Sequence, residues 1–207
     1  MNEKTYLAIF FRLRIHPKII YVTECALGCN LIGHCLAIVI IFNNSRGGNG
    51  CRLFLLAAED ALLQAPELVV LALLCQQVEQ IKATATSPLV FVGSSLGGFY
   101  TSQVAPLFAA NCILINPAIR PAQSMRKFLG RNTHFHYGRE WEFTEEICNS
   151  YQNFTDRRDA PIERLVVIGR NDTTLDPNEG RQYWQNHAII HETDDGHSVE
   201  AIDAVMQ

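Results

Sequence analysis

At the centre of this chain lies the stretch Gly93-Ser94-Ser95-Leu96-Gly97-Gly98, directly after the apolar run Pro88-Leu89-Val90-Phe91-Val92. The apolar run is typical of a buried strand, and the residues that follow the stretch have a helical pattern. A serine on such a sharp strand-to-helix turn needs neighbours without bulky side chains two positions away on either side, where Gly93 and Gly97 stand. The pattern therefore predicts Ser95 as a nucleophile, with Ser94 as a spacer.

A carboxylate follows a later strand, where the partner of such a serine belongs. A serine nucleophile needs a base, and the base needs an acid that orients it. The run Arg164-Leu165-Val166-Val167-Ile168-Gly169 predicts a short buried strand, and Asp172 comes just beyond its carboxyl end. Asp172 is the predicted acid. Asp176 is the alternative, although it could equally cap a helix over 179–185.

A histidine follows the next predicted strand. The strand over 188–192 runs into Thr193-Asp194-Asp195-Gly196-His197, after which Ser198 can cap a last helix with apolar positions at Val199, Ile202 and Val205. His197 is the predicted base, and His191 is the alternative. Each residue taken alone has an ordinary structural interpretation, but the order Ser, Asp, His after successive strands predicts a catalytic triad.

These motifs resemble the YqiA/YcfP-like small bacterial esterase family of the α/β-hydrolase superfamily. Residues 93–100 are similar to the family's elbow, and Asn116-Pro117-Ala118-Ile119-Arg120-Pro121 is similar to its Asn-Pro-Ala-x-Arg-Pro segment. The resemblance covers about 86–198, including Phe128-Leu129-Gly130 and the Asp-Gly-His that ends at His197. It implies an α/β-hydrolase fold, which is a mostly parallel sheet with helices on both faces and a small helical lid insertion. It also implies a serine esterase acting on short-chain acyl esters, with acyl-CoA as a further candidate.

Acyl transfer also requires an oxyanion hole, usually made of two backbone N–H groups. The elbow itself supplies the N–H of Leu96, at the start of a helix whose dipole favours negative charge. The resemblance assigns the second donor to the N–H of Phe42. Ile40 and Ile41 stand where the family has histidine and glycine, and isoleucine is poor where φ above zero is needed. The alternative function is therefore a non-catalytic α/β-hydrolase-fold binding protein with a defective oxyanion loop.

The wider pattern predicts strands that alternate with helices. Strands are expected over 36–42 and near 68–73, and helices over 52–64 and in a segment ending at Lys82. Continuous apolar runs at 89–92, 112–115 and 165–168 are typical of parallel strands buried on both faces. With 207 residues and 48% hydrophobic composition, we expect a single domain over 36–207, preceded by an N-terminal extension over 1–35.

The segment 121–161 is less regular and is the expected lid insertion. Its aromatic residues either line an acyl pocket over Ser95 or pack a small helical insertion onto the core. These residues are Phe128, Phe135, Tyr137, Trp141, Phe143, Tyr151 and Phe154. Arg120 lies just past the carboxyl end of a strand, where ligands of α/β proteins bind. It is the candidate for binding an anionic group of the substrate, and the alternative is that it ties down the lid through Asp or Glu.

Composition excludes several other functions. A formal net charge of -4 without a basic stripe argues against nucleic acid and favours a small acyl ester or thioester as the partner. The pair His134-x-His136 has no third ligand nearby, so we expect no metal and no cofactor. Seven irregularly spaced cysteines fit no disulfide framework and indicate reduced thiols in a cytoplasmic protein.

The run over 25–42 contains no formally charged residue and is long enough to suggest a membrane-spanning helix. Asn30, His34 and two glycines interrupt this run, and its last residues are needed for the first strand of the sheet. The sequence therefore argues against a membrane protein, and it leaves the oligomeric state open.

Overall fold

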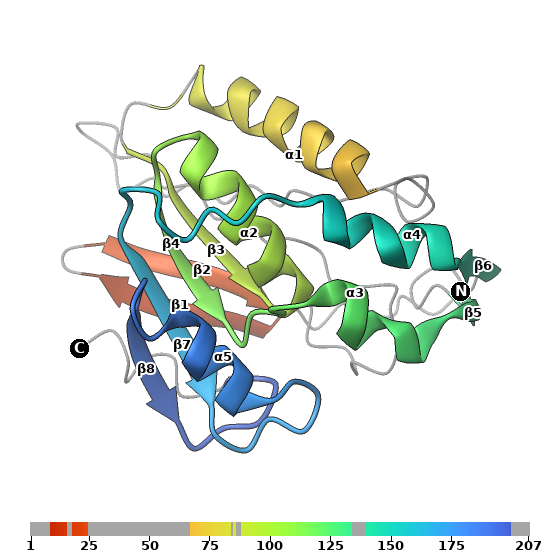
Figure 1. Cartoon of the computed structure of the whole chain (residues 1–207). Coiled ribbons are helices and arrows are strands. Elements are labelled where there is room, and N and C mark those ends of the chain that lie inside the picture. Colours follow the sequence, from red (N-terminus) through yellow and green to blue (C-terminus); the bar gives the residue numbers. More distant parts are fainter. Residues whose placement is uncertain are drawn as a thin grey trace, which may run out of the picture.

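The computed structural model of the chain describes residues 9–15, 18–24, 67–83, 85, 88–133 and 140–199 (Figure 1). Several predicted features lie outside these ranges: the strand over 36–42, the helix over 52–64, the last helix after Ser198, the oxyanion residue Phe42, and Ile40, Ile41, His134 and His136.

Four parallel strands form the central sheet, in the order β3-β4-β7-β8. Their bounds are Val90–Ser94 for β3, Asn111–Ile115 for β4, Arg164–Gly169 for β7 and Ile189–Thr193 for β8. The three continuous apolar runs are thus confirmed as adjacent parallel strands. The register pairs Ser94 with Ile115 and Gly169 with Thr193, so the carboxyl ends of the strands lie along one edge.

Helices that follow the strands pack against them. Helix α2 (Leu96–Leu107) contacts β3 and β4, and α5 (Pro177–Trp184) contacts β7 and β8. Helix α1 (Glu67–Lys82) packs on α2. The most deeply buried large side chains come from the strands and from α1 and α2: Phe91, Leu114, Val78, Val92, Val104 and Val166.

The strand predicted near 68–73 is wrong, because these residues lie within α1. Val70, Leu74, Val78 and Ile81 are all buried, and this spacing places them along one face of a helix. The apolar run alone does not distinguish a strand from a buried helix. The helix predicted to end at Lys82 is confirmed.

The segment 121–161 forms short helices around a small antiparallel hairpin. Its elements are α3 (Pro121–Ser124), the 3-10 turn η2 (Met125–Phe128), β5 (Gly130–Thr133), β6 (Glu140–Phe143), α4 (Glu145–Ser150) and the 3-10 turn η3 (Tyr151–Asn153). Trp141, Phe143 and Tyr151 are buried, so these three aromatics pack the insertion onto the core. Its action as a lid stays a prediction.

The N-terminal part contains a second hairpin, made of β1 (Ile9–Ile15) and β2 (Lys18–Glu24). Both strands fall within the predicted extension over 1–35. The division of the chain at residue 36 stays a prediction.

Cys75, Cys112 and Cys148 are three cysteines among the described residues. Cys112 and Cys148 are buried, and Cys75 is partly buried. Burial raises the pKa of the Cys112 thiol to about 12. Within the described ranges, none of the helices has both the length and the apolar character needed to cross a membrane. The same ranges contain no group of three or more His, Cys, Asp or Glu side chains placed to hold a metal ion.

Candidate active site

Ser95 occupies a strained turn between β3 and α2. Its φ of 55° lies in the left-handed region, which non-glycine residues rarely adopt. Backbone hydrogen bonds hold this conformation: the Ser95 N–H donates to the carbonyl of Ile115 over 2.9 Å, and its carbonyl accepts from the N–H of Ala118 over 2.9 Å. The predicted elbow is therefore present, with its serine at the apex.

Small residues around the turn allow close backbone approach. A Cβ added at Gly93 would collide with the Thr101 hydroxyl and with the carbonyl of Gly97. At Gly98, an added Cβ would lie 2.9 Å from the Cα of Pro117. The glycines therefore let the first turn of α2 lie directly against β3 and against the loop that leaves β4.

The structure brings Ser95, His197 and Asp172 together in one hydrogen-bonded chain. His197 Nε2 lies 3.0 Å from Ser95 Oγ, and His197 Nδ1 lies 2.7 Å from Asp172 Oδ2. The alternative acid, Asp176, instead caps α5 by accepting from the N–H of Asn178 over 2.9 Å. The alternative base, His191, lies within β8 opposite Val167.

The environment of Asp172 favours its charged form. Burial alone disfavours the carboxylate, but hydrogen bonds from His197 and from the N–H groups of Leu175 and Thr174 outweigh it. The pKa of Asp172 consequently lies below its ordinary value. An ionised Asp172 accepts a hydrogen bond from the Nδ1–H of a neutral His197, and Nε2 of this tautomer is then the acceptor for the Ser95 hydroxyl.

Asn116 is a further residue of the site, and the sequence pattern gives it no role. Its Nδ2 donates to the carbonyls of Gly196 and His197 over 3.1 and 2.7 Å, and its Oδ1 accepts from the N–H of Gly169 over 2.7 Å. It is 4% exposed, with a φ of 41°. A polar residue directly after an apolar strand, at the edge where the strands end, was the available signal.

Of the two predicted oxyanion donors, only Leu96 is among the described residues. It is the first residue of α2, and N–H groups in a first turn have no acceptor within their own helix. The helix N-terminus also carries partial positive charge. This N–H, directly after Ser95 in the chain, is therefore suited to donate a hydrogen bond to a developing oxyanion.

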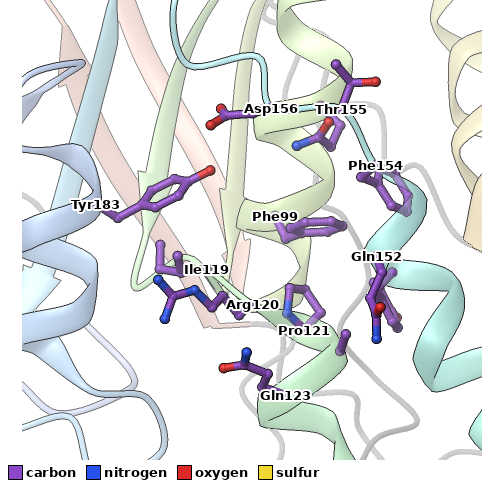
Figure 2. Close-up of a pocket in the computed structure, with 13 residues that line it drawn as sticks. Phe99, Ile119, Arg120, Pro121, Gln123, Gln152, Phe154, Thr155, Asp156 and Tyr183 are labelled. Atoms are coloured by element: carbon purple, nitrogen blue, oxygen red, sulfur yellow. The ribbon is translucent and has the colours of Figure 1, made fainter.

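A pocket of about 440 Å³ lies between α2, the insertion and α5 (Figure 2). It is lined by Phe99, Gln103, Ile119, Arg120, Pro121, Ala122, Gln123, Tyr151, Gln152, Phe154, Thr155, Asp156 and Tyr183. Arg120 is thus part of a pocket wall, and its Nη1 lies 3.0 Å from Glu179 Oε1 in α5. Of the aromatic residues expected over an acyl pocket, Tyr151 and Phe154 line this one.

Comparison with known proteins agrees with this architecture. Residues 60–207 match the model of a family described as "Uncharacterised protein family (UPF0227)". A UPF0227 protein from Shewanella woodyi is 28% identical over 104 residues, which are 50% of this chain and 52% of that protein. The chain therefore spans about half the length of this curated relative.

Among solved structures, Est1E from Butyrivibrio proteoclasticus is similar to this chain, with 14% sequence identity and a TM-score of 0.52. The match covers 66% of this chain and 67% of the Est1E chain. The same protein with ferulic acid bound has 15% identity, 69% and 68% coverage, and a TM-score of 0.56. At these identities the likeness concerns the fold, which is the α/β-hydrolase fold.

Proposed function

This chain belongs to the UPF0227 family, which is the family of the YqiA/YcfP-like esterases, and from this premise we propose that it is a serine hydrolase that cleaves carboxylic esters or thioesters. One observation carries the proposal. Ser95 Oγ, the His197 imidazole and the Asp172 carboxylate form a continuous hydrogen-bonded chain at 3.0 and 2.7 Å, with Ser95 on a strained elbow.

The first half of the reaction forms an acyl-enzyme. His197 Nε2 takes the proton of Ser95 Oγ as this oxygen attacks the carbonyl carbon, and Asp172 stabilises the imidazolium that results. The N–H of Leu96 donates a hydrogen bond to the oxyanion of the tetrahedral intermediate, and the family resemblance assigns the second donor to the N–H of Phe42. The intermediate then collapses, and the alcohol or thiol leaves with the proton that His197 returns to it.

The second half restores the enzyme. His197 removes a proton from a water molecule, and the oxygen of this water attacks the acyl carbon bound to Ser95 Oγ. The second intermediate releases the carboxylic acid, and His197 returns the proton to Ser95. No other group of the chain takes part in a covalent step of this scheme.

Labelling with a fluorophosphonate probe tests the proposal, because the probe reacts with activated serines. We expect labelling of the native chain and of Ser94→Ala, and none of Ser95→Ala, with all three folded by circular dichroism. Ser94→Ala is the matched control, because it removes the adjacent hydroxyl at the end of β3. Absence of labelling in the folded native chain would contradict the proposal and favour the non-catalytic binding protein.

The leaving group is tested with 4-nitrophenyl butyrate and butyryl-CoA, which share an acyl chain. Release of 4-nitrophenol or free thiol that depends on Ser95 identifies an esterase or a thioesterase, respectively. If Ser95 is labelled but neither substrate is hydrolysed, the serine is activated and the proposal of short-chain acyl substrates is wrong.

A further inference from the structure

The pocket beside the elbow starts next to the groups that hold Ser95. The Ser95 carbonyl accepts hydrogen bonds from the N–H groups of Ala118 and Phe99, over 2.9 and 3.2 Å. Phe99 itself lines the pocket, as do Ile119 and Arg120, which follow Ala118 directly. Phe99 lies one turn, or about 6 Å, along α2 from Ser95. A substrate that reacts at Ser95 must therefore extend by several bonds along α2 to reach the pocket.

The pocket has an apolar floor and a polar rim. Phe99, Ile119, Pro121 and Phe154 supply the floor, and the rings of Phe99 and Phe154 are 4.9 Å apart in an edge-to-face arrangement. Figure 2 shows Arg120 and Gln123 at one end, Asp156 and Thr155 at the other, and the Phe99 ring between the two ends. The walls thus suit a hydrocarbon segment with a polar group at its far end.

The two ends differ in their available hydrogen-bonding capacity. At one end, both carboxylate oxygens of Asp156 accept from the Arg158 guanidinium, over 3.0 and 2.9 Å from Nε, and this bonding lowers the pKa of Asp156. At the other end, Arg120 has five N–H donors, and its ion pair within the described residues uses Nη1 toward Glu179. The Arg120 side chain is 60% exposed. Donors are therefore in excess where Arg120 lies.

Tyr183 closes the side of the pocket toward α5 as a neutral group. Its ring lies under the Arg158 guanidinium, 3.9 Å from the carbon to the ring centroid, and burial raises the pKa of its hydroxyl. The charged groups facing the pocket are consequently Asp156, which Arg158 neutralises, and Arg120, which Glu179 contacts on one side. Because each of these charged groups has an oppositely charged partner, the remaining N–H donors of Arg120, and not a net positive charge, favour an anionic acceptor at this end.

We propose that this pocket selects esters that carry a carboxylate, with the hydrocarbon part of the substrate on the Phe99 floor and the carboxylate on the Arg120 guanidinium. The inference rests on the proposed function, because it assumes hydrolysis at Ser95. A planar guanidinium can bind a carboxylate through two parallel hydrogen bonds, which gives selectivity for the charged substrate over a neutral one of equal length.

Two matched pairs of esters test the proposal. Mono-4-nitrophenyl adipate and 4-nitrophenyl hexanoate have six-carbon acyl groups and the same leaving group, and differ in the terminal carboxylate. The hexanoate esters of 4-hydroxybenzoate and of phenol place the charge on the leaving group instead. The pocket binds either the acyl group or the leaving group, so one of the two pairs should respond. For that pair, we expect Arg120→Gln to lower kcat/KM for the anionic ester about tenfold and to change kcat/KM for the neutral ester less than twofold.

Two further variants separate substrate recognition from structure and from overall charge. Glu179→Gln removes the partner of Arg120 but keeps the guanidinium, so kcat/KM for the anionic ester should be unchanged or higher. Arg126→Gln removes an equally positive side chain that pairs with Glu145 over 2.7 Å outside the pocket, and it should leave both members of each pair unchanged.

The outcomes separate the inference from the proposed function. Equal effects of Arg120→Gln on anionic and neutral esters in both pairs would overturn the inference while leaving the esterase intact. Loss of selectivity in Glu179→Gln as large as in Arg120→Gln would also overturn it, because the ion pair would then act structurally. Failure of native protein to hydrolyse either neutral ester, together with an unlabelled Ser95, would overturn the proposed function and the inference with it.

Discussion

Asn116 donates a hydrogen bond of 2.7 Å from its side-chain amide to the backbone carbonyl of His197. The same side chain accepts from the N–H of Gly169, at the end of the strand that leads to Asp172. One buried amide therefore joins the loop that carries His197 to the strand end that precedes Asp172. These side-chain hydrogen bonds go to backbone groups on either side of the site, so the expected role of Asn116 is to position His197.

Replacing Asn116 should affect both the positioning of His197 and the stability of the folded protein, and the two effects can be measured separately. Asn116→Gly keeps the positive φ without strain but leaves two carbonyls and one N–H without their partner. We expect a loss of about 1–3 kcal/mol in the free energy of unfolding and at least about a tenfold slower fluorophosphonate labelling of Ser95. Denaturant unfolding and labelling rates measure the two effects.

Asn132 provides the matched control for this substitution. It is also a buried asparagine, and its Nδ2 donates to the carbonyls of Phe128 and Gly130 in the insertion. Asn132→Gly should cost comparable stability and leave the labelling rate of the folded protein unchanged. Equal slowing of labelling in the two variants would contradict a positioning role for Asn116.

Asp172 and Asp176 should differ sharply in their effect on activity. Asp172→Asn removes the carboxylate that holds His197 Nδ1, and the loss in kcat should be on the order of 10³ to 10⁴. Asp176→Asn keeps a good helix cap on α5, so activity and stability should change little. Steady-state kinetics on 4-nitrophenyl butyrate compares them. Equal losses at both positions would show that Asp172 is not the acid.

The stability of the chain should depend on acid pH through Asp172. An aspartate in the unfolded chain has a pKa near 3.9, and the pKa of Asp172 in the folded state is lower. Its stabilising contribution is therefore fully present above about pH 4 to 5. The contribution is lost as the pH falls through the folded-state pKa. Native protein should therefore lose stability more steeply than Asp172→Asn as the pH falls below about 4. Denaturant unfolding at a series of pH values measures the slopes, and parallel slopes would refute the prediction.

Gly93 should not tolerate even one methyl group. In Gly93→Ala, the Cβ collides with the Thr101 hydroxyl and with the backbone carbonyl of Gly97, which cannot rotate away. We expect destabilisation of about 1–3 kcal/mol or more, measured by thermal unfolding. Gly180→Ala in α5 is the control: its Cβ meets Ile168 Cδ1 at 3.5 Å, so the helix should gain about 0.5–1 kcal/mol. A neutral Gly93→Ala would contradict the tightly packed elbow.

Local sequence was most informative where one residue pattern has one structural solution. The continuous apolar runs that became β3, β4 and β7 were predicted because a strand buried on both faces has no polar alternation. The elbow was predicted because its glycines and serine act within six consecutive residues. The apolar run at the start of α1 has two solutions, and a strand was wrongly predicted there because its packing partners lie far along the chain.

The sequence by itself determined β3, β4 and β7, the elbow and the order Ser, Asp, His, all of which depend on neighbouring residues. Only the tertiary structure placed Asp172, and not Asp176, against His197, placed Asn116 against the His197 loop, and paired Arg120 with Glu179 across the pocket. These contacts depend on the parallel register of the sheet, which brings together residues as much as 102 positions apart. Such distances are set by the packing of whole elements, and no local pattern of residues encodes them.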